Sequence, residues 1–185
     1  MRVNTEQRAT NIKLENKMDF IKDANLAIQG DEKAMERLYY NTYPKLKAVT
    51  VSILKNESDA EDIIQETYIK TFSSLNQLDN ASKFEAWLCR IASNKCKDYL
   101  KKQRFTEELT DNLNVFYDMP SEEIGIMDCI CKLNPKSSIY ITLRFYNDMT
   151  YEDVAQVLKE PVSTTKYKTQ KALLELKKYL KGDVS

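Results

Sequence analysis

Acidic side chains recur at helical spacing between residues 59 and 66. Asp59, Asp62 and Glu66 are three and four positions apart, so they share one face of a helix. Carboxylates in this arrangement can hold a divalent metal ion, or they can form a solvated or protein-binding surface. Metal-dependent catalysis needs ligands that converge from several elements, and no second acidic cluster stands in a suitable motif. We therefore interpret the face as a solvated or protein-binding surface and expect no metal ion and no other cofactor.

Nucleophilic chemistry lacks its usual residues, because the chain has 4 cysteines and no histidine. Serine–histidine and cysteine–histidine nucleophiles and histidine-containing metal sites are thereby excluded. The cysteines contain no C-x-x-C pair, so we expect reduced thiols that pack as small apolar residues. No phosphate-binding loop or dinucleotide fingerprint is present. The sequence therefore predicts a protein that is not an enzyme.

A basic and aromatic stretch runs from Lys83 to Arg104 and contains seven basic residues and two acidic ones. Phe84 and Trp87 stand at helical spacing beside Arg90 in this stretch. Aromatic residues on a helix usually belong to the core. Beside cations they can also stack on unpaired bases, at about 1–3 kcal/mol per base. The pattern leaves both interpretations open.

Charge is segregated along the chain, although 28 basic and 28 acidic residues give a formal net charge of zero. Residues 159–181 again contain seven basic and two acidic residues, whereas residues 105–128 contain seven acidic residues and no basic one. Each basic segment thus has a net charge of +5, and the acidic segment between them has −7. Segregation of this kind is an argument about partners. The acidic helix over residues 59–72 next to the aromatic, basic helix likewise suggests two partners, one a protein and the other a polyanion.

Helices are expected to position these residues. Only 3 glycines and 4 prolines occur in 185 residues, and this composition favours an all-α fold over a sandwich or a barrel. Apolar spacing predicts a helix from Met18 that Gly30 ends, and a second helix that Asp31 caps and Pro44 breaks or restarts. The acidic helix then begins at residue 58 or 59 with Ser58 or Asp59 as its cap. A loop over residues 73–82 and an aromatic helix to about residue 102 follow.

The last third of the chain predicts a helix-turn-helix. Residues 122–133 and 137–146 have helical patterns, and Thr150 with Asp153 resembles a capping box. A short helix, a turn over residues 159–161 and a long basic helix over residues 162–180 then follow. No run of about 18 apolar residues occurs, and residues 1–17 are polar without a signal-peptide core. We therefore expect a cytoplasmic protein with no direct membrane insertion.

Three blocks in this order resemble the sigma-70 family of bacterial transcription initiation factors, in its extracytoplasmic-function class. DAEDIIQETYIKTF (59–72) is similar to region 2.2, and FEAWLCRIASNKCKDYLKK (84–102) is similar to regions 2.3 and 2.4. TYEDVAQVLKEPVSTTKYKTQKALLELKKYL (150–180) is similar to region 4.2. The resemblance implies two helical domains joined by an acidic linker. The expected divisions are a flexible N-terminal extension (1–17), region 2 (18–104), the linker (105–121) and region 4 (122–185).

The resemblance also implies partners and residue roles. The partners would be core RNA polymerase, through its β′ clamp helices and β flap, promoter DNA and an anti-sigma factor. Residues on the acidic helix would bind the clamp helices, namely Asp62, Gln65 and Glu66. Residues of the loop and the aromatic helix would melt and read the promoter minus-10 element, namely Asn76, Asn80, Lys83, Phe84, Trp87, Arg90, Asn94, Lys95 and Lys97. Residues of the last helix would enter the major groove at the minus-35 element, namely Ser163, Thr164, Lys166, Lys168 and Lys171.

The last block departs from the family pattern at several positions. Lys159 stands where the turn usually has glycine, which matters if that position needs a positive φ. Pro161 replaces a small polar cap, or serves as the first helical residue. Thr165 and Thr169 replace aliphatic core residues, and lysines replace arginines, which contact guanine in a bidentate way. Two alternatives to an alternative sigma factor remain: a stand-alone helix-turn-helix regulator, and a sigma-like decoy that binds an anti-sigma factor.

Overall fold

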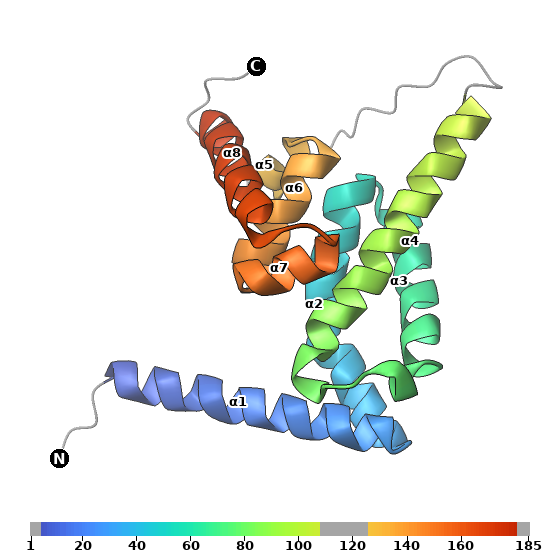
Figure 1. The fold of residues 1–185 in the computed structure, drawn as a ribbon, viewed down its shortest axis with the longest axis vertical. Helices are drawn as coiled ribbons and strands as arrows, with labels where there is room; N and C mark the ends of the chain where they lie inside the picture. Colours follow the sequence, from blue (N-terminus) through green and yellow to red (C-terminus); the bar gives the residue numbers. More distant parts are fainter. Residues whose placement is uncertain (1–4, 108–125, 181–185) are drawn as a thin grey trace.

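The computed structural model describes residues 5–107 and 126–180, and every regular element in them is a helix. This result confirms the predicted all-α fold. The N-terminal domain consists of α1 (Thr5–Ile28), α2 (Glu32–Leu54), α3 (Glu57–Phe72), the short 3₁₀ helices η1 (Leu75–Gln77) and η2 (Ala81–Lys83), and α4 (Phe84–Glu107). The C-terminal domain consists of α5 (Ile126–Lys132), α6 (Pro135–Ile141), the π-helix η3 (Thr142–Tyr146), α7 (Tyr151–Leu158) and α8 (Val162–Leu180). Figure 1 shows α7 beside the N-terminal half of α4, and α8 at the outer side of the C-terminal domain.

The helix ends of the N-terminal domain follow local capping. The Asp31 carboxylate accepts a hydrogen bond from the Ala34 amide at 2.8 Å, as predicted for the cap of α2. The cap of α3 was predicted wrongly, because Asn56 accepts from the Asp59 amide instead of Ser58 or Asp59 acting as the cap. Pro44 neither breaks nor restarts α2, which continues through it. Pro44 lies on the exposed side of the helix, where solvent can replace the missing backbone bond.

The first helix begins at Thr5 and not at Met18, so most of the segment expected to be a flexible extension is helical. Its C-terminal half is tied to α2 by two hydrogen bonds from the Arg37 Nε and Nη2 atoms to one oxygen of Asp23, at 3.0 and 2.6 Å. Phe20 of α1 contacts Phe84 of α4, with ring centroids 6.0 Å apart. The end of α1 therefore belongs to the core of the N-terminal domain. In Figure 1 its N-terminal half projects away from the other helices.

The C-terminal domain contains the predicted helix-turn-helix in α7 and α8. The capping box is present, since the Thr150 hydroxyl accepts from the Asp153 amide at 3.1 Å and an Asp153 oxygen accepts from the Thr150 amide at 3.4 Å. Lys159 ends α7 in the left-handed conformation, with φ 56°. The helix expected over residues 137–146 is divided, because α6 passes into the π-helix η3. Residues 105–107 belong to α4, and the rest of the predicted linker, 108–121, lies outside the described residues.

Replacing Lys159 with glycine is expected to raise the free energy of unfolding by about 1 kcal/mol. A Cβ atom in the left-handed region is strained against the backbone, and glycine removes that strain. The lysine side chain is exposed, so little packing is lost with it. Urea denaturation measures the difference. The matched control is Lys159→Ala, which keeps the Cβ atom. Equal stability of the glycine and alanine variants would show that the backbone at this turn is not strained.

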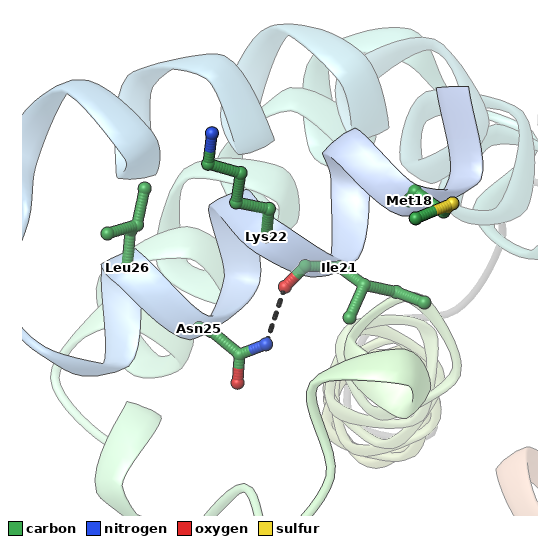
Figure 2. Close-up of a pocket in the computed structure, with 5 residues that line it drawn as sticks. All are labelled: Met18, Ile21, Lys22, Asn25 and Leu26. Atoms are coloured by element: carbon green, nitrogen blue, oxygen red, sulfur yellow. Dashed lines mark hydrogen bonds between the residues drawn. The ribbon is translucent and has the colours of Figure 1, made fainter. Parts of the chain in front are cut away.

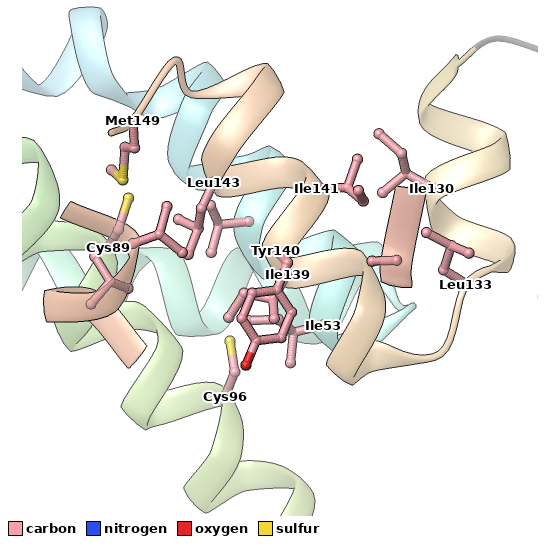
Figure 3. Close-up of a cluster of buried hydrophobic side chains, with 14 of the residues drawn as sticks. Ile53, Cys89, Cys96, Ile130, Leu133, Ile139, Tyr140, Ile141, Leu143 and Met149 are labelled. Atoms are coloured by element: carbon pink, nitrogen blue, oxygen red, sulfur yellow. The ribbon is translucent and has the colours of Figure 1, made fainter. Parts of the chain in front are cut away.

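The two domains share a hydrophobic core. One cluster of buried side chains lies wholly in the N-terminal domain and includes Leu38, Ile64 and Phe84. A second cluster joins Ile53 and Cys89 of the N-terminal domain to residues of α5, α6, η3 and α7. Figure 3 shows Cys89 beside Met149 and Leu143 in this second cluster. The C-terminal domain therefore packs directly against α2 and α4.

Candidate nucleic-acid and protein interfaces

The acidic face of α3 is a solvent-facing surface. Asp62, Gln65 and Glu66 are all exposed, whereas Ile63 and Ile64 are buried on the opposite side. Ile69 continues the exposed face one turn later, and its apolar side chain is 72% exposed. We call Asp62, Gln65, Glu66 and Ile69 the α3 face. Ile69 was not among the residues predicted from the sequence, although it stands four positions after Gln65 and three after Glu66.

Glu66 joins the α3 face to α4 through an ion pair. Its Oε2 atom lies 2.6 Å from the Nζ atom of Lys95. The hydrogen bond and charge of Lys95 lower the pKa of Glu66, so this carboxyl is ionised at neutral pH. A residue assigned to a protein partner and one assigned to DNA thus contact each other. An exposed pair of this kind is worth only about 0.2–1 kcal/mol, so a partner can separate it.

The loop between α3 and α4 is organised by Asn80. Its side-chain oxygen accepts hydrogen bonds from the Ser82 amide at 2.9 Å and the Ser82 hydroxyl at 2.7 Å, which starts η2. Asn76 in η1 and Lys83 in η2 are exposed. The Nζ atom of Lys83 lies 2.7 Å from an Asp153 oxygen of α7. The predicted loop is therefore partly helical and contacts the C-terminal domain.

The burial of Phe84 favours the core interpretation over the base-stacking one, the two alternatives that the sequence pattern left open. Its side chain is 0% exposed and packs in the core of the N-terminal domain against Phe20. Trp87, three residues later, is only partly buried at the edge of the same core. The two rings therefore have different surroundings, and Trp87 alone can reach a ligand in this arrangement.

A partly exposed stripe follows one side of α4 from Trp87 onward. Arg90 and Asn94 are half-buried, and Lys97 is exposed. These residues are three or four positions apart, so their side chains line up along the helix. Lys95 lies outside the stripe, on the side that meets α3. Two cations and an amide beside an aromatic ring form a surface suited to a single-stranded nucleic acid.

The predicted recognition face of α8 is open to solvent. Ser163, Lys166, Lys168 and Lys171 are exposed, and Thr164 is half-buried. The Nζ atom of Lys166 lies 5.7 Å from the ring centroid of Tyr151, the first residue of α7. The lysines of α8 can therefore supply positive charge along one side of the helix-turn-helix.

Glu160 organises the turn between α7 and α8. Its carboxylate accepts hydrogen bonds from Lys168 at 2.6 Å, Thr165 at 2.9 Å and Tyr140 at 3.0 Å. Burial alone would raise the pKa of Glu160, but these three hydrogen bonds outweigh it and the pKa is lowered. Lys168 is therefore partly neutralised inside the turn, whereas Lys166 contacts only an aromatic ring among the described interactions.

The two threonines that depart from the family pattern in α8 are buried and hydrogen-bonded. Thr165 and Thr169 are completely buried. The Thr169 hydroxyl donates to the Thr165 carbonyl at 2.8 Å, and the Thr165 hydroxyl donates to Glu160, so neither polar atom lacks a partner. Pro161 precedes the helix, which begins at Val162, and so occupies the cap position instead of the first helical position.

Other surface features carry less information. A shallow groove on α1 is lined by Met18, Ile21, Lys22, Asn25 and Leu26, and it contains one hydrogen bond within the helix (Figure 2). In the part of the chain that the structure describes, no group of three or more possible metal ligands comes together. No described helix is long and apolar enough to cross a membrane. The four cysteines are free thiols, three of them buried and Cys131 partly so.

Known protein families match both domains. Sigma-70 region 2 matches residues 38–106, and Sigma-70 region 4 matches residues 123–176. The extracytoplasmic-function (ECF) RNA polymerase sigma-E factor of Haemophilus influenzae is 30% identical over 157 residues, covering 75% of this chain and 82% of that protein. The ECF RNA polymerase sigma factor SigW of Bacillus subtilis is 26% identical over 172 residues, covering 83% of this chain and 92% of that protein.

Solved structures share the fold. CnrH in complex with the cytosolic domain of CnrY has a TM-score of 0.66 at 24% identity, covering 89% of this chain and 99% of that chain. The sigma factor RpoE in complex with the anti-sigma factor NepR, from Bartonella quintana, has a TM-score of 0.71 at 22% identity, covering 82% of this chain and 99% of that chain. The chain therefore belongs to the sigma-70 family, in its ECF class. It is an alternative sigma factor in a family of non-catalytic transcription initiation proteins.

Proposed function

We propose that this sigma factor binds core RNA polymerase through the α3 face and directs it to a subset of promoters through α4 and α8. The observation that carries the proposal is the exposed acidic surface of α3, which Glu66 joins to Lys95 of α4, the helix that also carries the cationic, aromatic stripe. A protein that holds DNA gains nothing from an exposed face with two carboxylates and an amide near its DNA site unless another partner covers that face. The partner proposed for this face is the pair of β′ clamp helices.

The proposed polymerase contact combines charge with one apolar residue. Asp62, Gln65 and Glu66 supply the polar part, and Ile69 supplies an exposed apolar side chain at the same surface. Apolar side chains at the centre of an interface usually contribute more to affinity than charges at its rim. Ile69 is therefore added to the residues predicted from the sequence.

The proposed minus-10 surface extends from the loop to the middle of α4. Its members are exposed or partly exposed. Phe84 is completely buried and is therefore not included. Trp87 supplies an aromatic surface for a base, and the cations hold the single strand by charge. The proposed residues are Asn76, Asn80, Lys83, Trp87, Arg90, Asn94, Lys95 and Lys97.

The proposed minus-35 surface is the exposed side of α8. Ser163 and Thr164 stand at the start of the helix, where side chains of a recognition helix reach base edges. Lys166, Lys168 and Lys171 supply phosphate contacts and set the register. Because lysine is a point charge, we expect this surface to contribute more to affinity than to the discrimination of guanine.

The remaining proposals concern the setting of this activity. We propose that the protein acts in the cytoplasm, has no enzymatic activity and is regulated by an anti-sigma factor. The proposed divisions are residues 18–104 for region 2, 105–121 for the linker and 122–185 for region 4. The linker's net negative charge suits the basic RNA-exit path of the polymerase.

Run-off transcription with purified core polymerase tests the proposed function. A promoter-specific transcript that requires this protein is the expected result. A decoy would yield no transcript while still binding an anti-sigma factor. A stand-alone regulator would bind duplex DNA tightly without polymerase, and that outcome would contradict the proposal.

A further inference from the structure

Lys55 lies at the contact between the two domains. It ends α2 in the left-handed conformation, with φ 57°, and its side chain extends into the C-terminal domain. Its Nζ atom lies 3.3 Å from the carbonyl oxygen of Ile130 in α5 and 3.2 Å from the hydroxyl oxygen of Ser138 in α6. The ammonium group is therefore buried only while the domains are packed together.

The surroundings of this ammonium group are unfavourable to its charge. Both hydrogen-bond acceptors are uncharged, and burial lowers the pKa of Lys55 from 10.5 to about 8. The nearby Cys131 thiol of α5 acts in the opposite direction but does not outweigh burial. Glu57 of α3 and Asp128 of α5 are the carboxylates that act on Cys131. Moving a cation from water to such a site opposes the packing of the domains.

The two acceptors are also satisfied without Lys55. The Ile130 carbonyl accepts a backbone hydrogen bond from Leu133 at 3.2 Å. The Ser138 hydroxyl donates to the Ser52 carbonyl at 2.7 Å, and this bond joins the same two domains. The neighbouring cluster of Ile53, Ile130 and Leu133 is apolar. An unbranched apolar side chain of similar length would thus fit the site and leave no buried polar atom unpaired.

We propose that Lys55 weakens the contact between the two domains and thereby lets them separate. Separation returns the ammonium group of Lys55 to water. The free energy gained by this hydration offsets part of the free-energy cost of exposing apolar surface between the domains. If the hydrogen bonds of Lys55 instead stabilised the contact, replacing Lys55 would favour separation of the domains.

The effect of pH on the equilibrium between packed and separated domains has a definite direction. Below about pH 8, Lys55 is protonated in both arrangements, so its full opposition to packing is present. Between about pH 8 and 10.5, the packed form loses its proton while the separated form keeps it. Raising the pH through this range therefore favours the packed form.

The test is pulse labelling of cysteines with iodoacetamide, mapped by mass spectrometry. Cys89 of α4 is a reporter, because it is buried against the C-terminal domain, where the Asn147 amide nitrogen lies 3.6 Å from its sulfur. Its labelling requires the domains to open. In the full-length protein at pH 7, Lys55→Met is expected to slow labelling of Cys89 by about tenfold. The ratio between this variant and the wild type should shrink toward pH 9.5.

The controls separate this effect from general ones. Lys33→Met removes an exposed lysine from the same helix and should leave the rate unchanged. Lys55→Gln, which keeps polar groups, should slow labelling in the same direction. Equal or faster labelling of Cys89 in both Lys55 variants would overturn the proposal, as would rapid labelling of Cys89 in the wild type to the level of an unfolded peptide. None of these readouts depends on polymerase or DNA.

Discussion

Replacing Phe84 with alanine is expected to lower the free energy of unfolding by about 3–5 kcal/mol, the range for truncating a buried phenylalanine. The ring is 0% exposed and contacts the ring of Phe20 in α1. The truncation leaves a cavity between α1 and α4 that the surrounding helices cannot fill completely. Urea denaturation followed by circular dichroism measures the loss.

Two matched variants separate a core role from a base-stacking role. Phe84→Leu keeps most of the buried volume, so it should cost less than about 1.5 kcal/mol and leave promoter melting intact. Trp87→Ala changes a side chain that is only partly buried. It should cost less stability than Phe84→Ala and impair promoter melting in the presence of polymerase. A stable Phe84→Ala protein that fails to melt the promoter would restore the base-stacking role to Phe84.

The sequence could not distinguish these two aromatic residues. Phe84 and Trp87 are three positions apart, which places both near the same side of a helix. Whether one of them is buried depends on α1, whose end covers Phe84 through Phe20. The helical pattern of α1 is weak before residue 18, so its start at Thr5 and its packing were not evident. Burial by an element distant in the sequence cannot be read from local periodicity.

Local signals were reliable where the partners are neighbours in the sequence. The helical spacing of the acidic residues correctly placed Asp62 and Glu66 on one exposed face of α3. The capping box of Thr150 and Asp153 involves residues three positions apart, and it was predicted correctly. The prediction of the α3 cap failed because several adjacent polar residues can serve as the N-cap, and the backbone geometry selects Asn56.

The packing of the two domains had no sequence signal. The hydrogen bond from Ser138 to Ser52 joins residues that are 86 positions apart. Cys89 and Cys96 were expected to be buried, but their spacing along α4 does not indicate that helices of the C-terminal domain cover them. The sequence indicated two separate domains. It therefore predicted neither the core that they share nor the position of Lys55 at their contact.

Replacing Glu66 with lysine is expected to weaken binding to core polymerase by about 2 kcal/mol, or roughly thirtyfold in Kd. The change reverses a charge on the α3 face and places it against a partner surface that would be cationic. Surface-charge substitutions away from the core usually change stability by less than about 0.5 kcal/mol, so the fold should persist. Binding to core polymerase is measured by fluorescence anisotropy at two salt concentrations, because screening should reduce the difference between variants.

Glu66→Lys also breaks the ion pair with Lys95, so a second variant must remove that pair alone. Lys95→Ala does so and leaves the α3 face acidic; polymerase affinity should remain close to that of the wild type, while promoter binding by the holoenzyme weakens. Ile69→Ala tests the apolar part of the same face and should weaken polymerase binding without the salt dependence that the charge reversal shows. If Glu66→Lys and Ile69→Ala both bind like the wild type, the α3 face is not the polymerase contact. If Lys95→Ala weakens polymerase binding as much as Glu66→Lys does, Lys95 is needed to hold the Glu66 carboxylate in the position that binds polymerase.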